Sequence, residues 1–226
     1  MSIYSSYMAV LKRRRAMAHP PPQAKDGATP KAPKIRERQK SRTREKIAKA
    51  AFELFSSRGI TFTTTLHIAR RAGVSHGSVF AHFPTKQDLV VSVIQKYAAR
   101  MVERIHELAE AGAGLRPVLQ AHLAGLSQYE PFYANLITEG PILPADVRLT
   151  LLAIQSAVSF HLAEAAEAEA RQARLKPVRL DLLFNTWIGL LHHFLANRDL
   201  FAPGKSVLAA RGEELIDHFL GLLRPG

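Results

Sequence analysis

The sequence lacks cysteine altogether and has a single tryptophan among 226 residues. Without cysteine there is no disulfide framework, no thiolate metal site and no cysteine nucleophile. Apolar runs are also short, and none approaches the roughly 20 residues that cross a bilayer. The opening residues MSIYSSYMAVLKRRR place their charges after a weak apolar stretch, which is the reverse of a secretory signal. We therefore expect a cytoplasmic protein that does not engage a membrane.

Signatures of strands and of enzymes are missing as well. The sequence contains no G-x-S-x-G, P-loop, G-x-G-x-x-G or H-E-x-x-H motif, and no close carboxylate pair stands inside an apolar helical segment. No run shows the alternation that indicates a β-strand, and no internal repeat occurs. The sequence therefore predicts an all-α protein that is not an enzyme and carries no cofactor.

Acidic residues are scarce in one part of the chain. Residues 1–86 hold 18 Lys and Arg against 4 Asp and Glu, whereas residues 87–226 hold 13 against 15, which together give the net charge of +12. Such an asymmetry is typical of a nucleic-acid-binding module followed by a domain of a different kind. Because 47% of the residues are hydrophobic, the chain can also bury a sizeable core.

Residues 1–40 combine several prolines with scattered Lys and Arg and have almost no apolar periodicity. This composition does not repay the entropy cost of ordering, so it predicts a disordered basic tail. One interpretation is an arm that adds non-specific attraction to phosphates. The alternative is a cloning or start-site artefact, because Met8 and Met17 are both candidates for the true first residue.

Helical periodicity begins at Ser41, and three helices are predicted before Pro84. The first ends at Gly59, a natural helix terminator. The second follows a cap at Thr63 or Thr64 and the third follows a cap at Ser75. The third helix is very short, because the residue before a proline is pushed out of the helical region.

The spacing within these helices is that of a helix-turn-helix. Ala69 is small where two helices must cross closely, and Gly73 can adopt the positive φ of a sharp turn. Val79 returns to the shared core ten residues after Ala69. A merely structural helical hairpin is the alternative, but the basic surroundings favour DNA binding.

A family resemblance rests on the residues that surround this motif. TREKIAKAAFELF from Thr43, Gly59, Ile68-Ala69, AGVS from Ala72, Gly77 and HFPTK from His82 together resemble the tetracycline-repressor (TetR) family of bacterial regulators. The resemblance implies a homodimeric regulator that responds to a ligand.

The chain is thus expected to have three parts: a disordered basic tail over residues 1–40, a helix-turn-helix DNA-binding domain over residues 41–86, and a helical effector-binding and dimerisation domain over residues 87–226. Within the last part, after a long helix that begins near Lys86, the apolar pattern predicts helices at about 116–128, 131–139, 145–174, 179–197 and 206–223.

Candidate DNA contacts lie on the two helices of the motif and at the start of the helix that follows. A recognition helix as short as residues 76–81 places only a few side chains in the major groove, and helix starts attract phosphates. The family often has Lys or Arg at the position of His76 and Tyr at that of Phe80, so this chain departs from the pattern at both. The candidates are Thr64, Thr65, His76, Gly77, Ser78, Phe80, His82 and Lys86.

Other residues near the motif are assigned different roles. Arg70 and Arg71 are interpreted as solvated, and four phenylalanines are placed in the core. These core residues are Phe52, Phe55, Phe62 and Phe83.

The helical domain offers candidates for a small-molecule site. A mostly apolar cavity with a few polar groups is what such a site requires, and the resemblance implies that an inducer binds among these helices. The candidate pocket walls are Tyr129, Phe132, Tyr133, Phe160, Phe184 and Trp187, each with plain core packing as the alternative. His192 and His193 are adjacent and lack the i, i+4 spacing of a helical metal pair, so no metal site is predicted.

The last two predicted helices carry broader apolar faces than one buried side requires. The resemblance implies that they pair with their copies, so that the two-fold axis of a homodimer matches a palindromic operator. We place Leu191 and Phe219 in that interface, with a purely intramolecular core as the alternative.

The predicted function is sequence-specific binding of double-stranded DNA by a transcriptional regulator, a repressor that a small-molecule effector releases. The competing function is constitutive or architectural DNA binding without an effector, which a steep salt dependence without sequence preference would favour.

Overall fold

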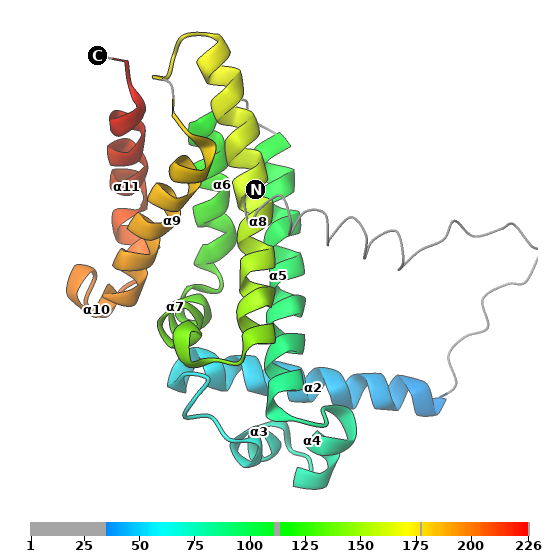
Figure 1. The fold of residues 1–226 in the computed structure, drawn as a ribbon. Coiled ribbons are helices and arrows are strands. Elements are labelled where there is room, and N and C mark those ends of the chain that lie inside the picture. The colour runs from blue at the N-terminus through cyan, green and yellow to red at the C-terminus, as the bar shows by residue number, and fades with distance from the viewer. Residues whose placement is uncertain (1–34, 111–113, 177, 226) are drawn as a thin grey trace, which may run out of the picture. The chain divides into compact units, whose positions relative to one another are not determined.

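The structure, a computed structural model, describes residues 35–110, 114–176 and 178–225, and these residues form helices and no strand (Figure 1). The all-α prediction is confirmed for this part of the chain. The helices are α2 (Ile35–Arg58), α3 (Thr65–Ala72), α4 (His76–His82), α5 (Lys86–Glu110), α6 (Leu115–Ser127), α7 (Glu130–Glu139), a 3₁₀ turn η1 (Gly140–Ile142), α8 (Ala145–Arg171), α9 (Leu180–Ala196), α10 (Arg198–Phe201) and α11 (Val207–Leu223).

Helix α2 begins at Ile35 rather than at the expected Ser41. The added residues include Arg, Glu, Gln and Lys, which are good helix formers, and all of them are exposed. An exposed stretch of this kind has no apolar periodicity, and for this reason the sequence pattern did not reveal it. The first 34 residues of the predicted tail lie outside the described residues.

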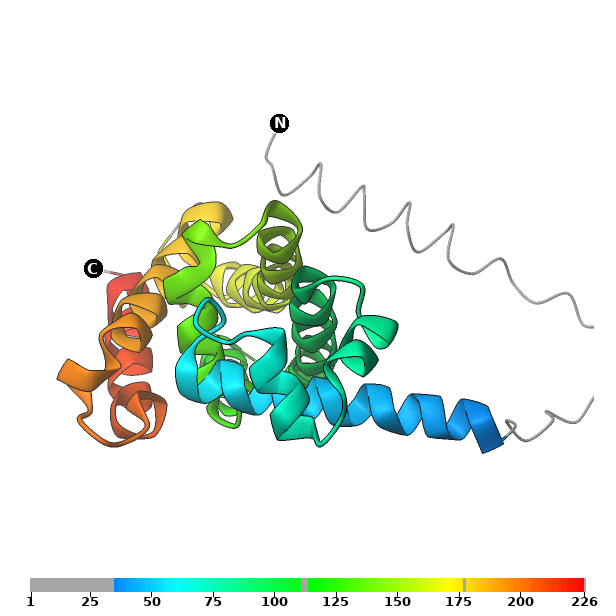
Figure 2. The same cartoon turned by 90° about the horizontal axis from the view of Figure 1, so that it is seen from below.

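Residues 41–226 form one compact unit, in which α2, α3 and α4 build a small core with the start of α5. Five large side chains of this core are at most 1% exposed: Ile47, Phe55, Ile68, Val79 and Phe83. Each contributes about 1.5–3 kcal/mol of burial free energy. Figure 2 shows the two helices of the motif, α3 and α4, beside α2.

Phe62 was expected in this core, but that prediction is wrong, because its side chain is 77% exposed. The cause is the turn after α2, where Gly59 adopts φ of +85°. The turn directs Ile60 and Thr63 inward instead, and both are at most 1% exposed. Phe62, between them, points to solvent.

The helical part packs α5, α6 and α8 against one another, and α6 also lies against α11 (Figure 1). Helix α9 contacts α7, α8 and α11. Buried in this layer are Leu115, Leu119, Trp187, Leu195 and Phe219. Among the described residues, no helix is long and apolar enough to span a bilayer.

The helices predicted beyond residue 115 are found with ends shifted by a few residues, and α10 was not predicted. Leu191 and Phe219, which were placed at the dimer interface, are both fully buried within the protomer. The apolar side chains of α9 and α11 are therefore largely buried within the protomer. There Trp187 packs on Phe219, with ring centroids 5.3 Å apart.

Candidate nucleic-acid interface

The second helix of the domain, α3, begins at a reciprocal cap. Thr64 has extended backbone angles, and its hydroxyl accepts a hydrogen bond from the His67 N–H at 3.2 Å. In return His67 Nδ1 accepts from the Thr64 N–H at 3.3 Å. This is a capping box in which histidine takes the place that Glu or Gln usually occupies.

The turn between α3 and α4 depends on Gly73. Its φ of 66° and ψ of 40° are left-handed, and its N–H donates to the Arg70 carbonyl at 3.3 Å. The Val74 N–H then donates to the Ala69 carbonyl at 3.1 Å. The predicted positive φ at Gly73 is confirmed, and it lets the chain reverse within a few residues.

Helix α4 has the predicted cap at Ser75, whose hydroxyl accepts from the Ser78 N–H at 3.1 Å. The Ser78 hydroxyl lies 2.9 Å from that of Ser75. Helix α4 ends at His82, because Phe83 is extended before Pro84, and α5 then begins with hydrogen bonds between Thr85 and Asp88. The short helix is therefore fixed at both ends by its own sequence.

Three of the predicted DNA-contact residues come together on the surface that α3 and α4 share. Thr65 Oγ1 lies 2.9 Å from His76 Nε2, and the rings of His76 and Phe80 meet edge to face with centroids 5.0 Å apart. Phe80 is 43% exposed. A polar group and an apolar ring therefore stand side by side at the solvent face of α4.

The other predicted DNA-contact residues differ in how exposed they are. Thr64 and Gly77 are exposed, whereas Ser78 and His82 are half-buried. Lys86 is also half-buried, and its ammonium donates to the Thr61 carbonyl at 3.2 Å. Burial lowers the pKa of Lys86, and the Glu139 carboxylate partly opposes this shift.

Sequence reasoning missed Arg44, which ties α2 to the end of α4. Its guanidinium donates to the His82 carbonyl at 2.6 Å and lies 4.1 Å from the centroid of the Phe83 ring. A second nitrogen donates to the Ser92 hydroxyl at 3.4 Å. Arg44 lies in the segment 43–55, but its partners are about forty or more residues away along the chain, so no local pattern indicated its role.

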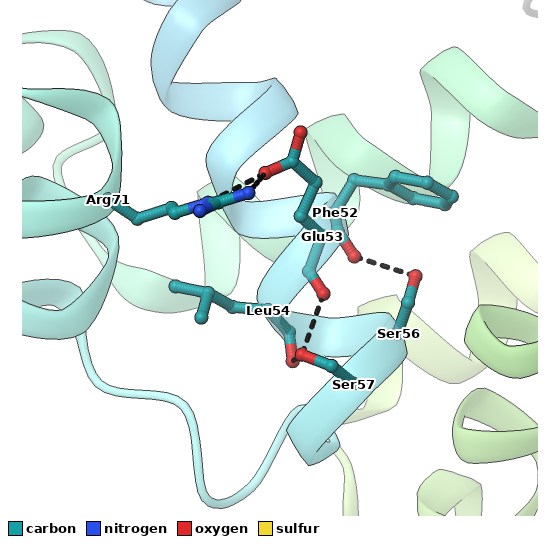
Figure 3. A network of polar contacts seen from close by, with 6 residues as sticks. All are labelled: Phe52, Glu53, Leu54, Ser56, Ser57 and Arg71. Carbon is teal, nitrogen blue, oxygen red and sulfur yellow. Dashed lines mark hydrogen bonds and ion pairs between the residues drawn. The ribbon is translucent and has the colours of Figure 1, made fainter.

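The acidic residues of the segment 41–86 are neutralised locally. This segment has 8 basic and 2 acidic residues. Glu45 pairs with Lys96 at 3.0 Å, and Glu53 pairs with Arg71 at 2.6 Å (Figure 3). Hydrogen bonding and charge attraction from Lys96 lower the pKa of Glu45. The remaining basic side chains give this domain a positive field that attracts an anionic polymer.

A hollow of about 680 Å³ lies between α2 and α3. It is lined by Glu53, Leu54, Ser57, Arg58, His67, Arg70 and Arg71. Arg58 and both α3 arginines stand in the last turns of their helices, where a cation compensates the helix dipole. Arg70 and Arg71 are both exposed, as their solvated interpretation expects, but Arg71 also pairs with Glu53.

The six candidate effector residues do not meet at one place. Phe160 is 45% exposed on α8, and Phe184 is half-buried on α9. Tyr129 and Phe132 join an aromatic cluster with Phe52 of α2, at centroid distances of 6.0 and 5.2 Å. Within that cluster Phe52 also stacks on Tyr97 of α5 at 3.8 Å. The cluster joins the helical part to α2.

The remaining two candidates, Tyr133 and Trp187, are buried, and each forms a polar pair with a histidine. The Trp187 Nε1–H donates to His122 Nδ1 at 2.9 Å, and the Tyr133 hydroxyl lies 2.9 Å from His192 Nε2. Burial, with repulsion from His192, lowers the pKa of His122 to about 3. Burial lowers the pKa of His192 to about 4 and raises that of Tyr133 to about 12. These groups are therefore neutral at physiological pH.

Comparison with known proteins bears on the DNA-binding part first. Residues 47–93 match the family described as bacterial regulatory proteins, tetR family. The HTH-type regulator YerO of Bacillus subtilis is 28% identical over 105 residues, which cover 44% of this chain and 36% of that protein. The HTH-type regulator TcmR of Streptomyces glaucescens is 25% identical over 158 residues, 67% of this chain and 66% of that protein. The chain thus spans about a third of YerO.

Solved structures share the fold over most of the chain. A TetR-family regulator from Agrobacterium tumefaciens superposes with a TM-score of 0.68 at 20% identity, covering 82% of this chain and 100% of that one. FadR from Bacillus subtilis, solved in complex with stearoyl-CoA, superposes with a TM-score of 0.65 at 18% identity, covering 78% and 97%. At these identities the likeness establishes the fold.

A capped α3, a left-handed glycine turn and a short exposed α4 define a helix-turn-helix protein with a helical C-terminal part. Residues 47–93 match the tetR family of bacterial regulatory proteins, and the fold over most of the chain is that of solved TetR-family regulators.

Proposed function

We propose that this protein binds DNA sequence-specifically and represses transcription until a small-molecule effector releases it. The observation that carries the proposal is the surface of α3 and α4, where Thr65, His76 and Phe80 are adjacent and accessible. An imidazole can bond a base edge, and an exposed ring can contact a thymine methyl in the major groove. Thr64 and Lys86, at helix starts, would position the backbone phosphates.

The regulator acts as a homodimer on a palindromic operator. Because a seven-residue α4 reads few bases, one domain alone gives little specificity. Support for a dimer comes from the solvent face of α9, where Leu182, Thr186, Gly189 and His193 recur at helical spacing. Leu182 is 52% exposed, and Gly189 allows a partner helix to approach closely.

The effector is expected to bind among the helices of the C-terminal part. Two polar pairs, the buried Trp187–His122 and the part-buried Tyr133–His192, support this proposal, because neutral polar groups among apolar helices orient a ligand. The structural relative FadR was solved with stearoyl-CoA, so the fold is compatible with an effector of that size.

The test is the ratio of affinities for specific and non-specific DNA. A duplex recovered by selection from a randomised pool and a scrambled duplex of equal length are titrated at one salt concentration. A regulator should prefer the selected duplex by about 10³-fold or more, as specific DNA-binding proteins do. Equal affinities with a steep salt dependence would instead establish an architectural protein.

A further inference from the structure

Helix α7 reaches across to the connection between α2 and α3. At its last residue, Glu139 Oε1 accepts a hydrogen bond from the Ile60 N–H at 2.9 Å. Its Oε2 accepts from the Thr61 N–H at 2.6 Å and from the Thr61 hydroxyl at 2.5 Å. One carboxylate from the helical part thus binds three donors of the DNA-binding part.

The chain makes room for this carboxylate at Gly59. A Cβ at that position would lie 2.4 Å from Glu139 Oε1, and the backbone there has φ of +85°. The left-handed conformation favours glycine, and a Cβ at this position would displace the carboxylate from its donors. The contact is therefore built into the turn that ends α2.

The opposite side of the same connection is held by Lys86, which donates to the Thr61 carbonyl at 3.2 Å. The N–H and the C=O of the Thr61 region are thus both fixed by charged side chains. Two residues further on, Thr63 is buried and donates to the Gly59 carbonyl at 2.7 Å. The next residue, Thr64, is the cap of α3, so the connection leads directly into the helix-turn-helix.

A second side chain of α7 reinforces this contact one turn earlier. Asn135 Nδ2 donates to the Phe55 and Ser56 carbonyls at 2.8 and 3.0 Å, while its Oδ1 accepts from Arg198 of α10 at 3.0 Å. Because both ends of the amide have partners of the matching kind, its orientation is determined. The contacts run continuously from α10 through α7 to the end of α2.

We propose that Glu139 and Asn135 form a clamp, the α7 clamp, through which the conformation of the helical part and DNA binding are coupled. The inference rests on the proposed function, because it concerns how that function is regulated. Apolar packing such as Phe132 on Phe52 tolerates sliding, whereas the clamp bonds are directional and hold one register. A shift of α7 must either carry the start of α3 with it or break these bonds.

The clamp can be tested without knowing the effector, because coupling is reciprocal. DNA bound at α4 must change the helical part if that part controls DNA binding. The probe is the selected duplex described above, and the measurement is hydrogen exchange of full-length protein with and without it. In the wild type, DNA should slow exchange in α7 and α10 by about five-fold or more, the lower range of allosteric coupling factors.

Glu139→Gln is the main variant. It keeps the size of the side chain, but its NH₂ group must face at least one of the donors that Glu139 binds. Exchange of the Ile60 and Thr61 amides should then accelerate without DNA, and the DNA-induced slowing should stay within residues 41–86. Glu167→Gln is the matched control, because this exposed glutamate of α8 undergoes the same loss of charge. It should behave as the wild type.

Asn135→Asp provides a second variant, since a carboxylate would face the two α2 carbonyls that the amide now binds. Far-UV circular dichroism and the emission of the single Trp187 report whether each variant is folded. If DNA still slows exchange in α7 and α10 of both folded variants, the clamp does not carry the coupling. A wild type whose α7 and α10 do not respond to bound DNA would overturn the inference as well. A wild type that prefers no duplex would refute the proposed function instead.

Discussion

Acidification should destabilise the helical part through one buried histidine, His122, and one half-buried histidine, His192. His122 and His192 have folded pKa values of about 3 and about 4, both lowered first by burial. In the unfolded chain a histidine has a pKa near 6.5. Each group is therefore neutral in the native state and takes up a proton on unfolding, so its contribution is fully present above pH 6.5 and is lost as the pH falls.

The size of the effect follows from the span between the two pKa values. One pH unit corresponds to about 1.4 kcal/mol for one such group. Between pH 7.5 and pH 5, each histidine should lose about 2 kcal/mol, and the two together about 4 kcal/mol. This loss is a large fraction of the roughly 5–15 kcal/mol that stabilises a typical domain.

Urea unfolding followed by Trp187 fluorescence measures this loss, because the indole of the single tryptophan donates to His122. His122→Gln keeps a carbonyl acceptor for the indole and should reduce the pH dependence by about 2 kcal/mol. His218→Gln, an exposed position on α11, controls for the loss of a histidine. An unfolding free energy that changes by less than about 1 kcal/mol between pH 7.5 and pH 5 would refute the neutral state of both histidines in the folded protein.

Four further predictions concern other parts of the chain. Gly189→Glu should produce folded monomers in sedimentation, because a Cβ there meets nothing within 4 Å in the protomer. Leu191→Glu should instead unfold the protein, because Leu191 is fully buried. If Gly189→Glu still forms a dimer, the interface lies elsewhere. Arg44→Ala should lower the unfolding free energy by about 1–2 kcal/mol, since it removes a charged hydrogen bond and a cation–π contact, and an unchanged urea midpoint would contradict this. Gly59→Ala should cost about 1–3 kcal/mol from its positive φ, measured in the same way, and a neutral effect would mean that the turn relaxes. Deleting residues 1–34 should weaken non-specific DNA binding at low salt and leave the selected sequence unchanged; altered preference at A·T positions would show that the tail reads a minor groove.

Local signals made the helix-turn-helix predictable. Thr64, Gly73 and Ser75 act through hydrogen bonds or backbone angles within a few residues of themselves, so the sequence alone contains the cause. The apolar periodicity of α6 to α9 and α11 is equally local, and those helices were found with shifted ends.

Long-range contacts account for most of what the sequence did not reveal. Glu139 meets Ile60 and Thr61 nearly eighty residues away, and no pattern in α7 distinguishes this glutamate from a solvated one. The role of Arg44 could not be predicted for the same reason, because its partner His82 lies far along the chain. The prediction that Phe62 is buried was wrong for another reason. Its hydrophobicity predicts burial, but the preceding turn determines which residue points inward.

Base reading by α4 is tested most directly by repeating the duplex selection with His76→Ala and Phe80→Ala. The wild type should recover a two-fold symmetric motif, and each variant should lose preference at one pair of symmetric positions while conserving the rest. A lost base contact at such a position is worth about 1–3 kcal/mol. Recovery of the same motif by both variants, with affinity lowered uniformly, would contradict base reading by this surface and reduce both residues to backbone contacts.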